Sequence, residues 1–180
     1  MVSDYNVRHL VSKGRLFLLT SVLLLFSETG CTVSYTASGA RILPQIKTAS
    51  IQYFLNRASL VQPGLSQTLT EALIDKCKTQ TSLSIVSSNG DVSFEGEITD
   101  YNTRPLTVSA DATAAMSRFT ITVKVKFTNS AEPDLNFEQS FSRYQDYDAN
   151  LDLSAVEKQL SDKIIEFLVE DIFNQAFVNW

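Results

Sequence analysis

The sequence predicts an α+β fold, a two-layer sandwich in which two helices pack on one face of a mixed, largely antiparallel sheet of about four strands. Apolar residues recur with helical spacing at 65–79 and at 154–177, and alternating apolar and polar residues fill much of the chain between them. Alternation with one polar side is typical of antiparallel strands covered on one face. Strands grouped between helices favour an α+β layer arrangement. We expect a single domain over residues 48–180.

The first predicted elements are a short strand and a helix. Apolar residues alternate over 48–54, as they do in a strand. From Leu65 they recur every three or four positions, which indicates an amphipathic helix. Gly64 is a candidate cap for this helix, and Thr68 and Glu71 have the spacing of a capping box one turn later.

A hairpin and three long strands are predicted next. A short strand at 83–86 leads into S-S-N-G at 87–90, and Asn-Gly after a strand is a strong hairpin signal. The apolar sides of the three runs that follow consist of Val92, Phe94 and Ile98, then Phe119, Ile121, Val123, Val125 and Phe127, then Leu135, Phe137 and Phe141. Residues 144–148 are expected to form a polar, aromatic connection.

The outer sides of the first two long runs carry opposite charges. Glu95 and Glu97 lie on the first run, and Lys124 and Lys126 lie on the second. If the two strands pair, these side chains come close enough for cross-strand ion pairs, each contributing about a few tenths of a kcal/mol. Two nearby carboxylates can also act as general acid and base. A structural role is favoured here, because this side is solvated and the lysines can neutralise the glutamates.

The last helix is predicted over 154–177, with Ser154 and Glu157 at capping-box spacing. Its main apolar stripe consists of Val156, Leu160, Ile164, Phe167, Leu168 and Ile172. A second apolar row consists of Ile165, Val169, Phe173, Phe177 and Trp180. This second row either widens the stripe that faces the core or, at Phe177 and Trp180, contacts a partner protein that covers the terminal ring.

The amino-terminal segment, 1–30, predicts a signal peptide with a lipobox. Basic residues precede an apolar run of 11 residues at 16–26. As a helix this run measures about 16 Å, too short for a bilayer core of about 30 Å. The run has the length of a signal-peptide core behind a basic region.

The lipobox itself ends at Cys31. Gly30 precedes this cysteine, while Glu28 stands where the common lipobox has an apolar residue. The motif implies cleavage before Cys31 and acylation of its sulfur and of the new amino terminus, and more than one acyl chain anchors a protein stably. The alternative is an ordinary secreted protein with a cysteine after its signal. Residues 31–47 are expected to be a tether between lipid and fold.

Composition excludes several function classes. The chain has 180 residues, 15 basic and 20 acidic, and its net charge of −5 argues against nucleic-acid binding. Its single histidine, His9, lies in the predicted signal peptide, so the mature chain would lack Ser-His-Asp systems and His-ligated metal sites. We expect no cofactor, no metal and no enzymatic activity. Cys77 would then be the one remaining thiol, and its helical spacing predicts a buried core residue.

Seven blocks of sequence also carry a family resemblance. They are GCTVSY at 30–35, ASIQYF at 49–54, LSQTLTEAL at 65–73, FEGEITDY at 94–101, TITVKVKFT at 120–128, FEQSFSR at 137–143 and LVEDIFNQAFVNW at 168–180. With these blocks the mature chain resembles the LptE family of lipopolysaccharide-assembly lipoproteins.

The resemblance implies a lipid-anchored protein on the periplasmic side of the outer membrane. It implies that the chain plugs the lumen of the LptD β-barrel, supports its assembly and so enables lipopolysaccharide export to the outer leaflet. Some members contact lipopolysaccharide through basic residues near a strand-connecting loop. The candidates here are Arg104, Arg118, Lys124 and Lys126, at or beside the loop 103–117. The alternative is that these four are ordinary solvated sheet residues.

Two other function classes remain open at this point. One is a periplasmic adaptor or pilotin lipoprotein that escorts another envelope complex by adding a strand or offering a groove. The other is a carboxylate-based hydrolase, which would need a pocket holding two perturbed acids.

Overall fold

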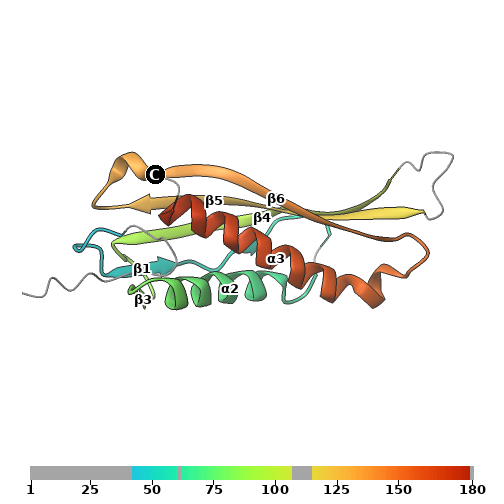
Figure 1. The fold of residues 1–180 in the computed structure, drawn as a ribbon, viewed down its shortest axis with the longest axis horizontal. Helices are drawn as coiled ribbons and strands as arrows, with labels where there is room; N and C mark the ends of the chain where they lie inside the picture. The colour runs from blue at the N-terminus through green and yellow to red at the C-terminus, as the bar shows by residue number, and fades with distance from the viewer. Residues whose placement is uncertain (1–41, 61, 107–114, 179–180) are drawn as a thin grey trace, which may run out of the picture. The chain divides into compact units, whose positions relative to one another are not determined.

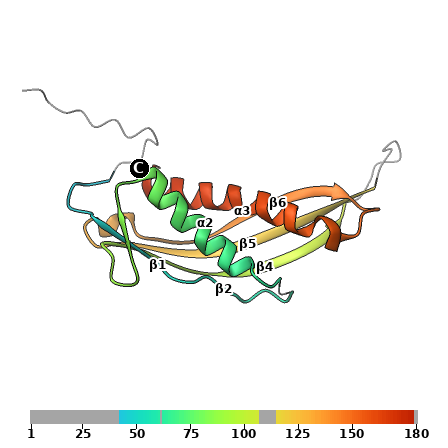
Figure 2. The ribbon, with the colours of Figure 1, turned by 90° about the horizontal axis from the view of Figure 1, so that it is seen from below.

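A computed structural model describes residues 42–60, 62–106 and 115–178, which form one mixed sheet with two helices against one of its faces (Figures 1 and 2). The elements are β1 (Thr48–Ile51), β2 (Leu55–Asn56), α2 (Leu65–Gln80), β3 (Ser84–Val86), β4 (Val92–Pro105), β5 (Met116–Asn129), the 3-10 turn η1 (Pro133–Leu135), β6 (Phe137–Asp148) and α3 (Leu153–Phe177). The α+β class and the placement of both helices on one face are confirmed.

The sheet differs from the prediction in size and in direction. Its described part has six strands rather than four, in the order β3-β1-β4-β5-β6, with β2 also beside β4. The pairs β1–β3, β1–β4 and β2–β4 are parallel, while β4–β5 and β5–β6 are antiparallel. The prediction of a largely antiparallel sheet was therefore wrong. Alternation within a strand reports which side is buried and carries no information about the direction of its neighbour.

The predicted hairpin at 87–90 is also wrong. Both β3 and β4 run parallel to β1 and lie on either side of it, so the loop between them crosses β1. A Cβ added to Gly90 would lie 2.5 Å from the backbone nitrogen of Ser50 and 2.8 Å from the carbonyl carbon of Ala49. Gly90 is therefore needed for the close approach of two backbone segments rather than for a hairpin turn.

The loop is fastened to β1 by Asp91. One carboxylate oxygen of Asp91 accepts hydrogen bonds from the backbone N–H groups of Lys47 and Thr48, at 2.8 and 2.9 Å, and from the Thr48 hydroxyl at 2.9 Å. The Asp91 N–H donates in return to the Thr48 hydroxyl oxygen at 3.0 Å. Ile46, just before β1, is 5 % exposed, so the described core begins ahead of the first strand.

The predicted pairing of the two long charged strands is confirmed. In the β4–β5 register Glu95 lies opposite Lys126, and Glu97 lies opposite Lys124. This register follows from the alternation, because a slip by one residue would move every apolar side chain to the other face.

A register shift between Ile98 and Asp100 changes the alternation in β4. It returns Tyr101 to the inner face, where the side chain is buried and its ring meets Phe119 edge-on, with 4.8 Å between centroids. The Tyr101 hydroxyl donates to the carboxylate of Glu157 on α3. Burial, together with this bond, raises the pKa of Tyr101 well above its usual value. The register shift therefore lets the part of β4 that follows Asp100 contact the start of α3 through Tyr101.

The third long strand extends further than predicted. β6 continues through 144–148, the segment expected to be a connection, and keeps an unbroken antiparallel register with β5 from Phe137 to Asp148. The strand continues because β5 supplies a partner for every residue of this segment, which is a non-local effect that the local composition does not reveal.

The two helices agree closely with the prediction. Gly64 is the N-cap of α2, with φ of 87°, a left-handed conformation that favours glycine. α3 is capped by Asp152, whose carboxylate accepts from the Ser154 N–H at 3.1 Å, so the cap lies two residues before the predicted one. No helix of the described ranges combines the length and apolar character that crossing a membrane requires.

The core lies between the helices and the inner face of the sheet. Half of the first predicted row of α3 and most of the second are buried in it; these residues are Ile164, Ile165, Leu168, Val169, Ile172, Phe173 and Phe177. Each large apolar side chain buried in this way contributes roughly 1.5–3 kcal/mol of transfer free energy. Cys77 is fully buried on α2, as predicted, and burial raises the pKa of its thiol to about 12.

Candidate functional site

The face of β4, β5 and β6 opposite the helices is polar along the described residues except for Met116 at the start of β5, and we call it the open face. Its cross-strand rungs are Glu95–Lys126–Glu138, Glu97–Lys124–Ser140, Asp100–Thr122–Ser142, Asn102–Thr120–Tyr144 and Arg104–Arg118–Asp146. Every rung offers hydroxyl, amide or charged groups to whatever covers the sheet. All four predicted basic residues project from this one face, because the alternation that defines the core also defines its polar side.

Arg118 lies at the end of the open face where β4 ends and β5 begins. Its guanidinium donates two hydrogen bonds to the carboxylate of Asp146, at 2.8 and 3.0 Å, and lies 3.6 Å from the centroid of the Tyr144 ring. The hydrogen bond raises the pKa of Arg118 and lowers the pKa of Asp146. A two-pronged bond and a stacked ring together hold the guanidinium in a fixed plane.

Arg104 lies directly opposite Arg118 in the β4–β5 register. Asp146 neutralises one of these two cations, and no carboxylate of the described residues forms an ion pair with Arg104. Like charges opposite each other on a sheet are unfavourable. This end of the open face therefore carries an exposed positive charge that an anionic group of a partner or ligand would stabilise.

The two lysines form a second group with a different character. Lys124 pairs with Glu138 at 2.5 Å and Lys126 with Glu95 at 3.4 Å. The hydrogen bond between Lys124 and Glu138 raises the pKa of the lysine and lowers that of the glutamate. These lysines are neutralised within the sheet, which favours the structural alternative for them.

The four predicted residues thus share a face without forming one cluster. Arg118 and Lys124 are six residues apart on β5, and at about 3.3 Å per residue that spacing separates them by roughly 20 Å. The pair Arg104 and Arg118 is the stronger candidate for contact with an anion, because of the two groups only this one has more basic side chains than carboxylate partners.

Glu138, Tyr144 and Asp146 belong to this face but were not singled out from the sequence. All three lie on β6, whose second half was expected to be a connection. The available signal was the pair of tyrosines at 144 and 147, since aromatic residues are enriched in strands.

The other predicted contacts fall in different places. Phe177 is 2 % exposed, and its ring lies 5.9 Å from that of Phe94 and 5.8 Å from that of Phe127, which favours the core-facing stripe over a partner contact. Trp180 and the lipidation candidate Cys31 lie outside the described residues.

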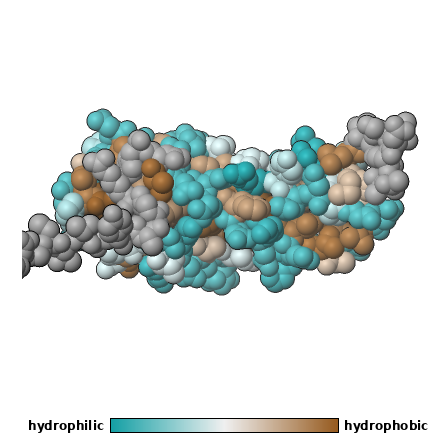
Figure 3. Space-filling view, viewed as in Figure 1, coloured by the Kyte–Doolittle hydropathy of each residue, from teal (hydrophilic) through white to brown (hydrophobic). Residues whose placement is uncertain are grey.

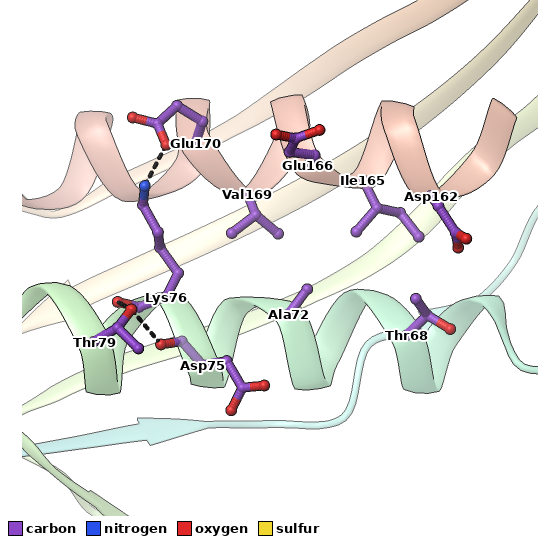
Figure 4. A pocket seen from close by; sticks show the side chains of 10 residues that line it. All are labelled: Thr68, Ala72, Asp75, Lys76, Thr79, Asp162, Ile165, Glu166, Val169 and Glu170. Carbon is purple, nitrogen blue, oxygen red and sulfur yellow. Dashed lines mark hydrogen bonds and ion pairs between the residues drawn. The ribbon is translucent and has the colours of Figure 1, made fainter. Parts of the chain in front are cut away.

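A shallow groove of about 510 Å³ lies between the two helices (Figure 4). Ile165 and Val169 of α3 point toward α2, and Ala72 points back, so the floor is apolar. Its rim carries Asp75, Asp162, Glu166 and Glu170, with Lys76 bound to Glu170. This acidic rim disfavours an anionic ligand. Within the described ranges, no group of three or more His, Cys, Asp or Glu residues is arranged to hold a metal ion.

Comparison with known proteins places this arrangement in a family. A family model described as lipopolysaccharide-assembly, LptE, matches residues 46–176. No curated protein matches the chain in sequence.

Several solved structures are similar in fold. A minor lipoprotein from Acinetobacter baumannii has 14% identity and a TM-score of 0.48, covering 72% of this chain and 91% of its own. An uncharacterised lipoprotein B from Nitrosomonas europaea has 16% identity and a TM-score of 0.45, covering 75% and 88%. Rare lipoprotein B from Shewanella oneidensis has 11% identity and a TM-score of 0.42, covering 72% and 90%. The family assignment rests on the sequence match alone, which spans well over half of the chain, and the protein belongs to the LptE family of lipopolysaccharide-assembly proteins.

Proposed function

We propose that this chain is an outer-membrane lipoprotein that plugs the lumen of the LptD β-barrel, supports the assembly of that barrel and thereby enables export of lipopolysaccharide to the outer leaflet. The family's role in lipopolysaccharide assembly supports this proposal, and it also supports, in general terms, a function without catalytic turnover. The family's role does not favour the adaptor or pilotin alternative.

The observation that carries the proposal is the open face. Large outer-membrane barrels have polar interiors, and a protein seated in one needs a surface that exchanges hydrogen bonds with water for hydrogen bonds with the wall. The five rungs of the open face carry five acidic and four basic side chains, so this surface is close to neutral although the whole chain has a net charge of −5. A surface that is nearly neutral as a whole and rich in hydroxyl groups fits a polar wall of either sign.

The proposed anchor is the acylated Cys31, on the periplasmic side of the outer membrane. Two or more acyl chains hold a protein at a bilayer stably, whereas a single chain does not. A tether over 31–47 would let the folded part enter the barrel while the lipid remains in the periplasmic leaflet.

Contact with lipopolysaccharide, in this proposal, is local to one end of the open face. The ligand is anionic and the chain is acidic overall, so attraction requires a place where basic groups exceed acidic ones. Arg104 beside Arg118 is such a place. Lys124 and Lys126 are proposed as weaker barrel contacts, since each already has a carboxylate partner.

Site-specific photo-crosslinking of the full-length protein in intact cells tests the proposal. A photoreactive residue at Arg104 or Thr120 on the open face is expected to capture an outer-membrane β-barrel. The same residue at Gln67, exposed on α2 away from the sheet, is the matched control. Depletion of the protein should also reduce surface lipopolysaccharide. Capture of a partner that is not a barrel from the open face, with normal surface lipopolysaccharide, would overturn the proposal.

A further inference from the structure

β6 forms one edge of the sheet and has an unusually accessible outer side. It pairs only with β5 among the described strands, over 12 residues with no register shift. Natural edge strands are usually short, bulged, interrupted by proline or protected by lysine. β6 is long, carries no bulge and contains neither proline nor lysine; its charged residues are Glu138, Arg143, Asp146 and Asp148, and Arg143 binds Asp171 on α3.

The register shows which backbone groups are exposed along this edge. The Ala149 N–H donates to the Ala115 carbonyl at 3.0 Å, just beyond the paired residues Met116 and Asp148. Because bonded and non-bonded pairs alternate in an antiparallel ladder, the odd-numbered residues of β6 bond to β5. The even-numbered residues Glu138, Ser140, Ser142, Tyr144 and Asp146 direct their N–H and C=O groups outward. The last even-numbered residue, Asp148, directs its N–H outward, while its carbonyl accepts from the Leu151 N–H at 3.0 Å.

A cavity of about 300 Å³ lies beside this edge, on the side of the helices. Gln145 of β6 forms one wall, and α3 contributes Gln159, Leu160, Asp162, Lys163 and Glu166. One turn further along α3, the ring of Phe167 is 40% exposed, with the Lys163 ammonium 5.0 Å from its centroid. In Figure 3, viewed as in Figure 1, the surface is largely hydrophilic with separate hydrophobic areas, so this side offers isolated anchoring points rather than a continuous apolar patch.

An exposed strand edge next to a side-chain pocket is the arrangement that recognises extended peptides, since the edge supplies main-chain hydrogen bonds and the pocket selects alternate side chains. We propose that an extended segment of another protein pairs with the outer edge of β6 as an additional strand and places one uncharged side chain in the cavity between Gln145 and α3. On the open face, the segment would carry hydroxyl or basic side chains, because β6 presents Glu138, Asp146 and Asp148 there.

A second copy of this chain is a poorer occupant. Antiparallel pairing of two β6 edges about Ser142 would set Glu138 opposite Asp146, and a shift by one bonded pair would set Glu138 opposite Asp148. Like charges directly opposite each other destabilise a sheet. The two registers centred on the strand thus disfavour a second copy, and we take the partner to be a different chain.

The surface can be tested by amide hydrogen exchange at single-residue resolution. The full-length lipidated protein would be compared alone in detergent and in the complex recovered from gently solubilised outer membranes. We expect the six outward amides of β6 to be unprotected in the isolated protein and to slow by roughly tenfold or more in the complex. The odd-numbered amides should be protected in both, because they already bond to β5.

A matched pair of variants removes one outward N–H. Ser142→Pro deletes that N–H without touching the β5 ladder, which is where proline is tolerated in an edge strand. Ser142→Ala is the control, because both variants lose the hydroxyl contact with Thr122, at 2.9 Å in the native protein. Ser142→Pro is expected to lower recovery of the partner by roughly tenfold, while Ser142→Ala retains it.

Strand pairing at β6 rests on the proposed function, because the complex to be measured is the one that function predicts. The possible outcomes nevertheless distinguish a failure of strand pairing from a failure of the proposed function. Co-purification with a barrel but no slowing of the even-numbered amides overturns the strand-pairing proposal alone. Slowing of those amides by a partner that is not a barrel supports strand pairing and overturns the proposed function. Concentration-dependent slowing in the isolated protein identifies a second copy as the occupant and overturns the choice of partner made here.

Discussion

Single side chains fasten the irregular parts of this fold, and Asp91 shows how. Its carboxylate holds the crossing loop against the start of β1 through donors on Lys47 and Thr48. These hydrogen bonds favour the charged carboxylate, so the pKa of Asp91 lies below its ordinary value of 3.8, with the Lys47 N–H as the largest cause. Protonation of one group therefore weakens the junction between three strands.

A pH series on Asp91→Asn tests this junction. A carboxylate whose pKa is lower in the folded state stabilises the fold at pH values above its unfolded pKa, and that contribution is lost as the pH falls through the lower folded value. The variant should be less stable than the native protein at neutral pH, and the difference should shrink below about pH 4. Urea unfolding at several pH values measures it.

Thr48→Val is the graded control for that series. It removes one of the three donors to the carboxylate, so the same pH dependence should persist with smaller amplitude. A constant difference between Asp91→Asn and the native protein from neutral to acid pH would contradict the argument.

Among the elements, the helices were the most predictable. The predicted ranges 65–79 and 154–177 differ from α2 and α3 by one residue each, because helical periodicity and caps are local features. The prediction of a hairpin at 87–90 was wrong, because an Asn-Gly pair indicates a flexible backbone but not the structure that this flexibility serves. At Gly90 that freedom serves a backbone crossing.

For the candidate site, the alternation of apolar and polar residues predicts which face a side chain lies on, but not which side chain it pairs with. Alternation placed Lys124 and Lys126 on one outer face, and the structure agrees; Arg118, predicted only as a residue beside the loop, lies on the same face. The acidic partners of Arg118 and Lys124, which are Asp146 and Glu138, come from β6, whose full length depends on pairing with a strand that precedes it in the chain. Which charges remain unbalanced is set by that pairing and could not be obtained from either strand alone.

Two adjacent residues of α3 give a prediction at this scale. Leu168 is fully buried, and Leu168→Ala should lower the free energy of unfolding by about 2–5 kcal/mol through lost burial and a residual cavity. Phe167 is 40% exposed, and Phe167→Ala should cost about 1 kcal/mol or less, mainly its contact with Lys163. Chemical denaturation of both variants measures the difference. Equal losses would show that the two faces of α3 are packed alike.

At the scale of the whole molecule, we propose that Cys31 anchors the protein to the membrane and that the folded part is equally stable without this anchor. Cys31→Ser should abolish incorporation of labelled palmitate and release the protein from the membrane fraction, because a hydroxyl cannot form the thioether bond. Circular dichroism and urea unfolding of the released protein should match those of the native protein.

Cys77→Ala is the matched control, since the sequence has only two cysteines. It should keep the palmitate label while losing some stability, because the thiol is fully buried. Label retained by Cys31→Ser would contradict lipidation at this residue.

The position of β1 affects how the protein is made. β1 precedes the other described strands in sequence, yet it is enclosed by β3 and β4, which begin 36 and 44 residues after it. A chain synthesised from its amino terminus cannot pair this strand until both of its neighbours have emerged. The meander from β4 to β6, by contrast, can zip together in order of synthesis, because its contacts join consecutive segments. The newborn chain therefore exposes the unpaired strand β1 until β3 and β4 have been made, and during that interval the chain is most prone to aggregate.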